Sequence, residues 1–179
     1  MTPSSEEDDG RTYHPCLFRL GGGEHYILWH DENLGGVHID GEGNTPAFST
    51  IDRLLEYAAL HGLQPVADET PTLHDLEWVE RFVDEMKSPL EDCRKLLIAW
   101  NLFGDVARST PSAGAAFQQR DRVMNAIYDK VFRGNNLPAI TRTGESYVPV
   151  WSPDELRSIK ALMKSGIALF HSTVTFSNL

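Results

Sequence analysis

The stretch YHPCLFRLGGGEHYILWH (residues 13–30) decides the fold that this sequence predicts. Residues 13–20 and 25–30 are rich in aromatic and branched side chains, which favour β-strands. Between them lie three glycines, 21–23, which can adopt the positive φ angles of a tight turn. The stretch therefore predicts a β-hairpin, and we expect residues 35–40 to add a third strand.

After the turn-rich segment 41–46, the apolar residues change to helical spacing. We expect a first helix from Ser49 or Thr50 to Gly62, then an extended or looped segment over 63–71. Three capping signals predict further helix starts, at Thr72 with Asp75, at Ser88-Pro89-Leu90-Glu91 and at Ser152-Pro153-Asp154-Glu155.

Two more segments complete the prediction for the second half of the chain. One helix, after a loop around residues 110–112, contains Phe117 to Phe132 and ends at Gly134-Asn135. The helix that starts at Ser152 is expected to end at Gly166, and the β-like segment 167–176 could return to the sheet.

These elements predict an α+β fold, in which a small, mostly antiparallel sheet is packed by about five helices. We expect residues 1–11 to be a disordered acidic tail and residues 12–179 to form a single domain. Within that domain, residues 12–72 are rich in strands and in acidic residues, and residues 73–179 are helical.

The composition is that of an ordinary globular protein, with 41% hydrophobic and 23% charged residues. No apolar run approaches the roughly 20 residues that span a bilayer, and the acidic N-terminus lacks the apolar core of a signal peptide. We therefore expect a cytoplasmic protein. Its two cysteines, Cys16 and Cys93, belong to no paired motif and are expected to be small buried side chains.

The charge is unevenly distributed along the chain, whose net charge is −10. The first 80 residues contain sixteen acidic and three basic residues, whereas the remaining 99 contain ten acidic and thirteen basic residues. Such an acidic half suits a basic partner, because complementary potentials speed association. It disfavours nucleic acid and membrane surfaces, whose phosphates it would repel.

The sequence contains no linear motif of an enzyme active site. Phosphate-binding glycine motifs, the GxSxG nucleophile motif and HExxH are all absent from it. Residues 40–44 begin like a calcium loop, but Thr45 and Ile51 replace the required glycine and glutamate, so we expect a turn. We accordingly expect no catalytic residue, no metal ligand and no cofactor.

Two alternatives to a simple binding protein remain open. Alternate residues of a strand lie on the same face, so His30 and His38, both at even positions, could share a side of the sheet. His25, at an odd position, would point away from His30. With a nearby carboxylate, this pair could serve a small metal-dependent hydrolase. The other alternative is an acidic decoy that occupies a nucleic-acid site on a host protein.

Several segments together resemble immunity proteins of bacterial polymorphic toxin systems, particularly those of contact-dependent growth inhibition. The first group is YILW (26–29), GVHID (36–40), FST (48–50), LLEYA (54–58) and GL (62–63). The second group is WNLFGD (100–105), YDKVFRGNNLP (128–138), WSPDEL (151–156) and GI (166–167). The resemblance, over residues 13–170, implies a cytosolic protein that binds and neutralises the C-terminal domain of a cognate toxin, often a basic nuclease.

The resemblance carries over no contact residue, so the candidate partner-binding residues follow from charge and position. Carboxylates in expected loops could pair with Lys and Arg of the toxin active site, and Trp29, at a strand end, is the first choice for an exposed aromatic anchor. Trp78 and Trp100 are expected in the core. The candidates are Trp29, Asp31, Glu32, Asp40, Glu42, Asp68 and Glu69.

Overall fold

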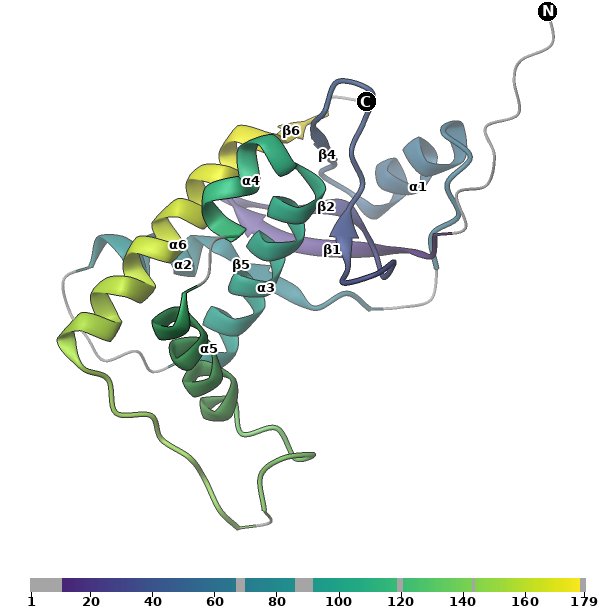
Figure 1. Cartoon of the computed structure of the whole chain (residues 1–179). Coiled ribbons are helices and arrows are strands. Elements are labelled where there is room, and N and C mark those ends of the chain that lie inside the picture. The colour runs from purple at the N-terminus through teal and green to yellow at the C-terminus, as the bar shows by residue number, and fades with distance from the viewer. Residues whose placement is uncertain (1–10, 67–69, 86–91, 119–120, 143, 178–179) are drawn as a thin grey trace, which may run out of the picture.

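The α+β prediction is confirmed by a computed structural model, which describes residues 11–66, 70–85, 92–118, 121–142 and 144–177 (Figure 1). Its elements are β1 (Tyr13–Leu20), β2 (Gly23–His30), β3 (Gly36–Val37), β4 (Thr45–Ala47), α1 (Ile51–Leu60), β5 (Leu73–Asp75), α2 (Leu76–Asp84), α3 (Cys93–Ser109), α4 (Pro111–Gln118), α5 (Arg122–Gly134), α6 (Pro153–Thr173) and β6 (Val174–Phe176). The predicted acidic tail lies almost entirely outside the described residues.

The main sheet has four strands in the order β3-β2-β1-β5. The predicted hairpin is confirmed: β1 and β2 are antiparallel, and Gly21 and Gly22 form the turn with φ angles of 64° and 83°. β3 adds antiparallel to β2, whereas β5 adds parallel to β1. The prediction of a helix start at Thr72 was wrong, because residues 73–75 pair with β1 and Asp75 caps α2 by accepting a hydrogen bond from the Trp78 N–H.

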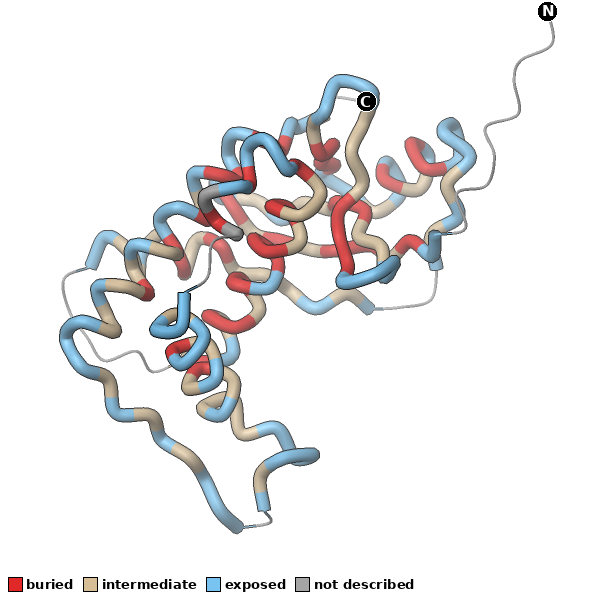
Figure 2. Tube along the Cα trace, viewed as in Figure 1, coloured by how far each residue is buried: buried red, intermediate tan, exposed pale blue. Residues whose placement is uncertain are grey.

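The sheet buries apolar side chains on both faces, which is why its strands contain aromatic residues at odd and even positions. Phe18 and Ile27 are fully buried in the large core that also contains residues of α2, α3, α5 and α6. Tyr13 and Leu28 belong to a second buried cluster, together with Leu54 of α1. Helix α1 therefore lies on one face of the sheet and the main helical layer lies on the other (Figures 1 and 2).

Helix α3 is the centre of the helical layer. Leu96, Trp100 and Phe103 are completely buried in it, as their helical spacing predicts, whereas Trp78 is half-buried. The start signal at residues 88–91 lies outside the described residues, and the described part of α3 begins after Asp92, whose side chain accepts a hydrogen bond from the Lys95 N–H.

The last helix differs from its prediction. It begins as expected, with a complete capping box between Ser152 and Glu155. The expected end at Gly166 was wrong: α6 continues to Thr173, and Gly166 instead gives room to the ring of Phe103, which a Cβ atom would collide with. Residues 174–176 alone are β-structured, and they pair with β4 in a separate two-stranded sheet rather than with the main sheet.

The single helix predicted over residues 117–132 was also wrong, because two helices, α4 and α5, occupy this region. Asp121 separates them and caps α5 by accepting a hydrogen bond from the Met124 N–H. The end of α5 at Gly134 is as predicted. The described residues of 135–152, which are all but residue 143, then form a long arm without helix or strand, and this arm projects from the rest of the described molecule (Figure 1).

Candidate functional site

The loop between β2 and β3, residues 31–35, holds two of the predicted binding carboxylates. Asp31, Glu32 and Leu34 are exposed, and Leu34 has 80% of its surface accessible although its side chain is apolar. The loop closes through a hydrogen bond from the Gly35 N–H to the Glu32 carbonyl oxygen, at 3.0 Å. It thus presents two carboxylates and one leucine from a tight turn.

The C-terminal end of α3 holds this loop in place. The guanidinium of Arg108 donates to the carbonyl oxygens of Leu34, at 2.8 Å, and Gly35, at 3.1 Å, and also pairs with Asp105. One residue later, the Ser109 hydroxyl accepts a hydrogen bond from the Val37 N–H, at 2.8 Å. The backbone at Leu34, Gly35 and Val37 is therefore bonded to a helix that is itself buried in the core, which restrains this end of the loop.

Trp29 packs against the loop and is half-buried rather than fully exposed, so its role as a partner anchor stays a prediction. Its indole N–H donates to a carboxylate oxygen of Asp105, at 2.8 Å, and its ring is half-buried against the large core. A Cβ atom on Gly35 would lie only 2.8 Å from Cζ2 of this ring. The exposed apolar residue of this site is Leu34, which the sequence analysis missed.

These side chains line an open hollow of about 320 Å³ beside the loop. Burial raises the pKa of Asp105, while the hydrogen bond from Trp29 and the charge of Arg108 oppose that increase. The Asp105 carboxylate is thus engaged by two donors from the protein itself. Its role in this arrangement is to position the indole and the guanidinium that carry the loop.

Of the two loop carboxylates, Glu32 pairs with the Arg11 guanidinium at 2.5 Å. Both partners are substantially exposed, so this ion pair contributes little to stability and can be exchanged for a cation of another molecule. Asp31 is exposed at the start of the loop. The two carboxylates are therefore accessible to a partner.

The turn at residues 40–44 is confirmed as a turn, but it lies apart from the 31–35 loop, beyond the other end of β3. The Oδ1 atom of Asp40 accepts hydrogen bonds from the Glu42 and Asn44 N–H groups, both at 2.9 Å, so it closes the turn. Glu42 is exposed. The remaining predicted residues, Asp68 and Glu69, lie outside the described residues.

His30 and His38 lie on one side of the sheet, as expected, because both rings contact Tyr13, with centroids 6.1 and 6.0 Å away. The His25 ring instead lies against Phe18, in the large core. Among the described residues, no three His, Cys, Asp or Glu side chains are placed to hold a metal ion. The described residues therefore supply no set of metal ligands for the hydrolase alternative, which stays a prediction.

Comparison with known proteins adds information on the fold. No family model and no curated protein matches the chain. In structure, the chain is similar to the SatS C-terminal domain, which was solved in complex with bromine. The TM-score is 0.56 at 16% sequence identity, over 92% of this chain and 94% of that one, and at this identity the similarity shows the fold alone.

The helices of the described residues were also compared with the requirements of a bilayer. None of them combines the length and the apolar character that crossing a membrane requires.

Proposed function

We propose that this chain is an immunity protein, which neutralises a cognate toxin domain by binding it through the 31–35 loop. The observation that supports the proposal is a loop, bonded to Arg108 of α3, that exposes Leu34 beside two carboxylates, Asp31 and Glu32. A toxin that cleaves nucleic acid needs Lys and Arg side chains at its active site, and these are the natural partners of such carboxylates.

The restraint of the loop by α3 favours tight binding. A loop that is already held in its bound shape loses little conformational entropy when a partner binds. Here the Arg108 guanidinium of α3 donates hydrogen bonds to the Leu34 and Gly35 carbonyl oxygens, and the Ser109 hydroxyl accepts one from the Val37 N–H just after the loop. The carboxylates would speed association and select a basic partner, while Leu34 would supply the apolar contact that slows dissociation.

The charge of the whole chain supports a protein partner over a nucleic acid. The net charge is −10, and the acidic excess lies in the first 80 residues, which include the loop. Phosphates would be repelled by this part of the chain. A basic nuclease domain would be attracted to it, and covering its active site requires no catalysis by this protein.

The first test concerns the partner and the two carboxylates. The full chain would be co-purified with the C-terminal domain encoded immediately upstream of its gene, and the affinity measured by titration in low and high salt. We expect D31K/E32K to weaken binding at least tenfold in low salt, with a smaller effect in high salt. The matched control is D52K/E56K, which makes the same charge change at exposed positions on α1.

The second test separates the apolar contact from the charge. Leu34→Ala is expected to increase the dissociation rate about tenfold, because a buried leucine contributes roughly 1.5–3 kcal/mol. Leu60→Ala is the control, since Leu60 is a leucine of α1 with a similar exposure of 72%. Equal effects of the two substitutions, or no complex with the upstream domain, would refute the proposal.

A further inference from the structure

The arm at residues 135–152 is fastened to the end of α5 by one side chain. The Asn136 amide donates to the Tyr147 carbonyl oxygen at 3.0 Å, and its oxygen accepts a hydrogen bond from the Tyr147 N–H at 2.7 Å. The same amide group also donates to the Gly134 carbonyl oxygen. Asn136 thus provides, along one edge of the arm, the pair of hydrogen bonds that a neighbouring strand would provide.

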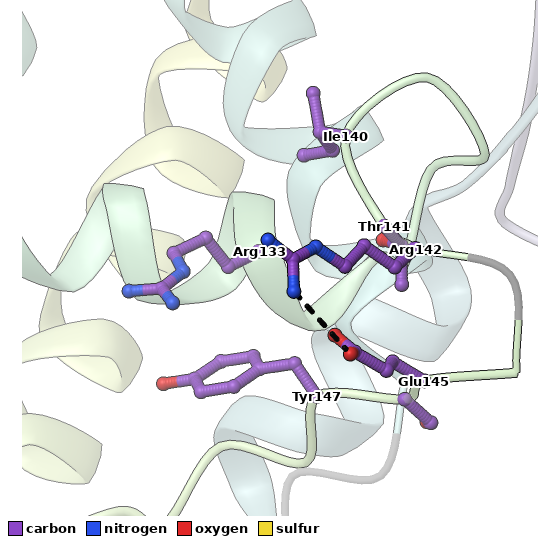
Figure 3. A pocket seen from close by; sticks show the side chains of 7 residues that line it. Arg133, Ile140, Thr141, Arg142, Glu145 and Tyr147 are labelled. Atoms are coloured by element: carbon purple, nitrogen blue, oxygen red, sulfur yellow. Dashed lines mark ion pairs between the residues drawn. The ribbon is translucent and has the colours of Figure 1, made fainter.

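Residues 147–151 alternate between half-buried and exposed positions, as residues of a strand do. On the inner side, the ring of Tyr147 lies under the Arg133 guanidinium, 4.9 Å away (Figure 3), and Trp151 lies under the Lys130 ammonium, also at 4.9 Å. Pro149 packs beside Gly134, where an added Cβ would approach its ring to 3.1 Å.

The outer side of the same segment consists of two valines. Val148 is 76% exposed and Val150 is 83% exposed, although valine is usually buried in folded proteins. Their exposure follows from the alternation, because the neighbouring positions face α5. The arm therefore presents a short apolar strip to solvent.

The backbone of this segment has one open edge. In an extended strand, the N–H and C=O groups of alternate residues point to the same edge. Those of Tyr147 point to Asn136, and Pro149, which has no N–H, shares that edge. The alternating burial of residues 147–151, which is that of an extended segment, places the N–H and C=O groups of Val148 and Val150 on the opposite edge, and these groups make no hydrogen bond with any described residue.

We propose that this open edge pairs antiparallel with the same segment of a second copy of the chain. The sequence YVPVW is nearly symmetric about Pro149, with a valine and then an aromatic residue on either side. A two-fold axis at Pro149 places Val148 of one copy opposite Val150 of the other. All four N–H and C=O groups of each open edge are then paired, and the proline, which cannot donate, lies where no donor is needed.

This symmetry distinguishes a second copy from an unrelated strand. In each copy Val148 and Val150 meet the same two residues of the other copy, so that the backbone groups of both edges are hydrogen-bonded. The four valines form one strip on the outer face of the pair. The contact is small, so the dimer is weak and forms reversibly at high protein concentration. Extended segments with an unpaired edge commonly bind partners by adding a strand.

The test is sedimentation equilibrium of the full chain, from about 10 μM to about 1 mM, the range in which weak complexes form. We expect the mean mass of the wild type to rise with concentration and that of V150P to stay monomeric, because V150P removes one open-edge N–H. Circular dichroism and a thermal melt establish that V150P folds. The matched control is V150T, which keeps the N–H and the β-branch and should still associate.

Hydrogen exchange resolved by residue gives a second, independent measurement on the unmodified protein. Exchange of the Val148 and Val150 amides should slow at least threefold between the lowest and highest concentrations, while that of the Tyr147 amide stays constant. A wild type that remains monomeric at the highest concentration would overturn the proposal. So would association of V150P as strong as that of the wild type, or unchanged exchange at both valines.

Discussion

The support of the 31–35 loop can be tested by a single substitution, Gly35→Ala. Gly35 has a φ angle of 83°, and a Cβ there would lie 2.8 Å from the Trp29 ring. The substitution therefore has two consequences: strain in the backbone, and displacement of the indole whose N–H donates to Asp105. Both should destabilise the fold and loosen the loop.

A matched glycine separates these two effects. Gly43 has a φ angle of 87° and closes a turn with its N–H as Gly35 does, but no atom lies within 4 Å of its hypothetical Cβ. Gly43→Ala should thus lose only the backbone term, about 1–2 kcal/mol. Gly35→Ala should lose in addition about 1.5–3 kcal/mol, the contribution of a hydrogen bond to a charged group.

The assay is thermal unfolding of both variants, followed by circular dichroism and by tryptophan fluorescence. For a chain of this size, 1 kcal/mol corresponds to about 2–4 °C in Tm, so Gly43→Ala should lower Tm by roughly 2–8 °C. On the same conversion, Gly35→Ala should lower Tm by about 3–12 °C more than Gly43→Ala does. Equal Tm values for the two variants would refute the inference that Trp29 fills the space above Gly35.

Three further predictions concern the core and the helix caps. Burial raises the pKa of Cys16 to about 12, so in a Cys93→Ser variant its thiol should not react with Ellman's reagent at pH 8 until the protein unfolds; labelling of that native variant would contradict this. The Ser152 N–H and the Lys130 ammonium hold the pKa of Glu155 below its usual range, so its stabilisation is present at pH 7 and is lost as the pH falls below about 4. Urea unfolding should therefore show E155Q to be less stable than the wild type by about 0.5–1 kcal/mol at pH 7 and equal to it at low pH. Gly166→Ala should lower Tm, because crowding against Phe103 costs about 1–3 kcal/mol and exceeds the gain of up to about 1 kcal/mol in helix propensity; an unchanged Tm would contradict it.

The sequence predicts those parts of the fold that depend on neighbouring residues. The hairpin follows from three consecutive glycines, and the starts of α1 and α6 follow from Thr50 and Ser152, whose side chains cap the next turn. Each of these signals acts over four residues or fewer.

The sequence does not predict the parts that depend on distant residues. β5 is a strand only because residues 73–75 find β1, which lies more than fifty positions earlier. The end of α6 was predicted wrongly at Gly166, which is a glycine because it packs against Phe103. The neighbouring sequence does not distinguish such a glycine from one that ends a helix.

The candidate site shows the same division. Asp31 and Glu32 were identified from charge and from a turn-like context, both of which are local. The hydrogen bond from Trp29 to Asp105 and the hydrogen bond from Arg108 to the Leu34 carbonyl oxygen join residues that are more than seventy positions apart. An apolar residue among polar neighbours, as in DENLG (31–35), is the one signal that could have indicated Leu34.

Helix α3 places the two proposed surfaces far from each other. The 31–35 loop is bonded to Arg108 and Ser109 at its C-terminal end, whereas Gly134, at the base of the arm, lies beside Cys93 at its N-terminal end. Seventeen helical residues separate these ends by about 25 Å. A dimer paired through the arms would therefore leave both loops accessible, and V150P should bind the toxin domain with the same affinity per site as the wild type. A change in that affinity would mean that the arm takes part in binding the toxin, and the two surfaces would have to be treated as one.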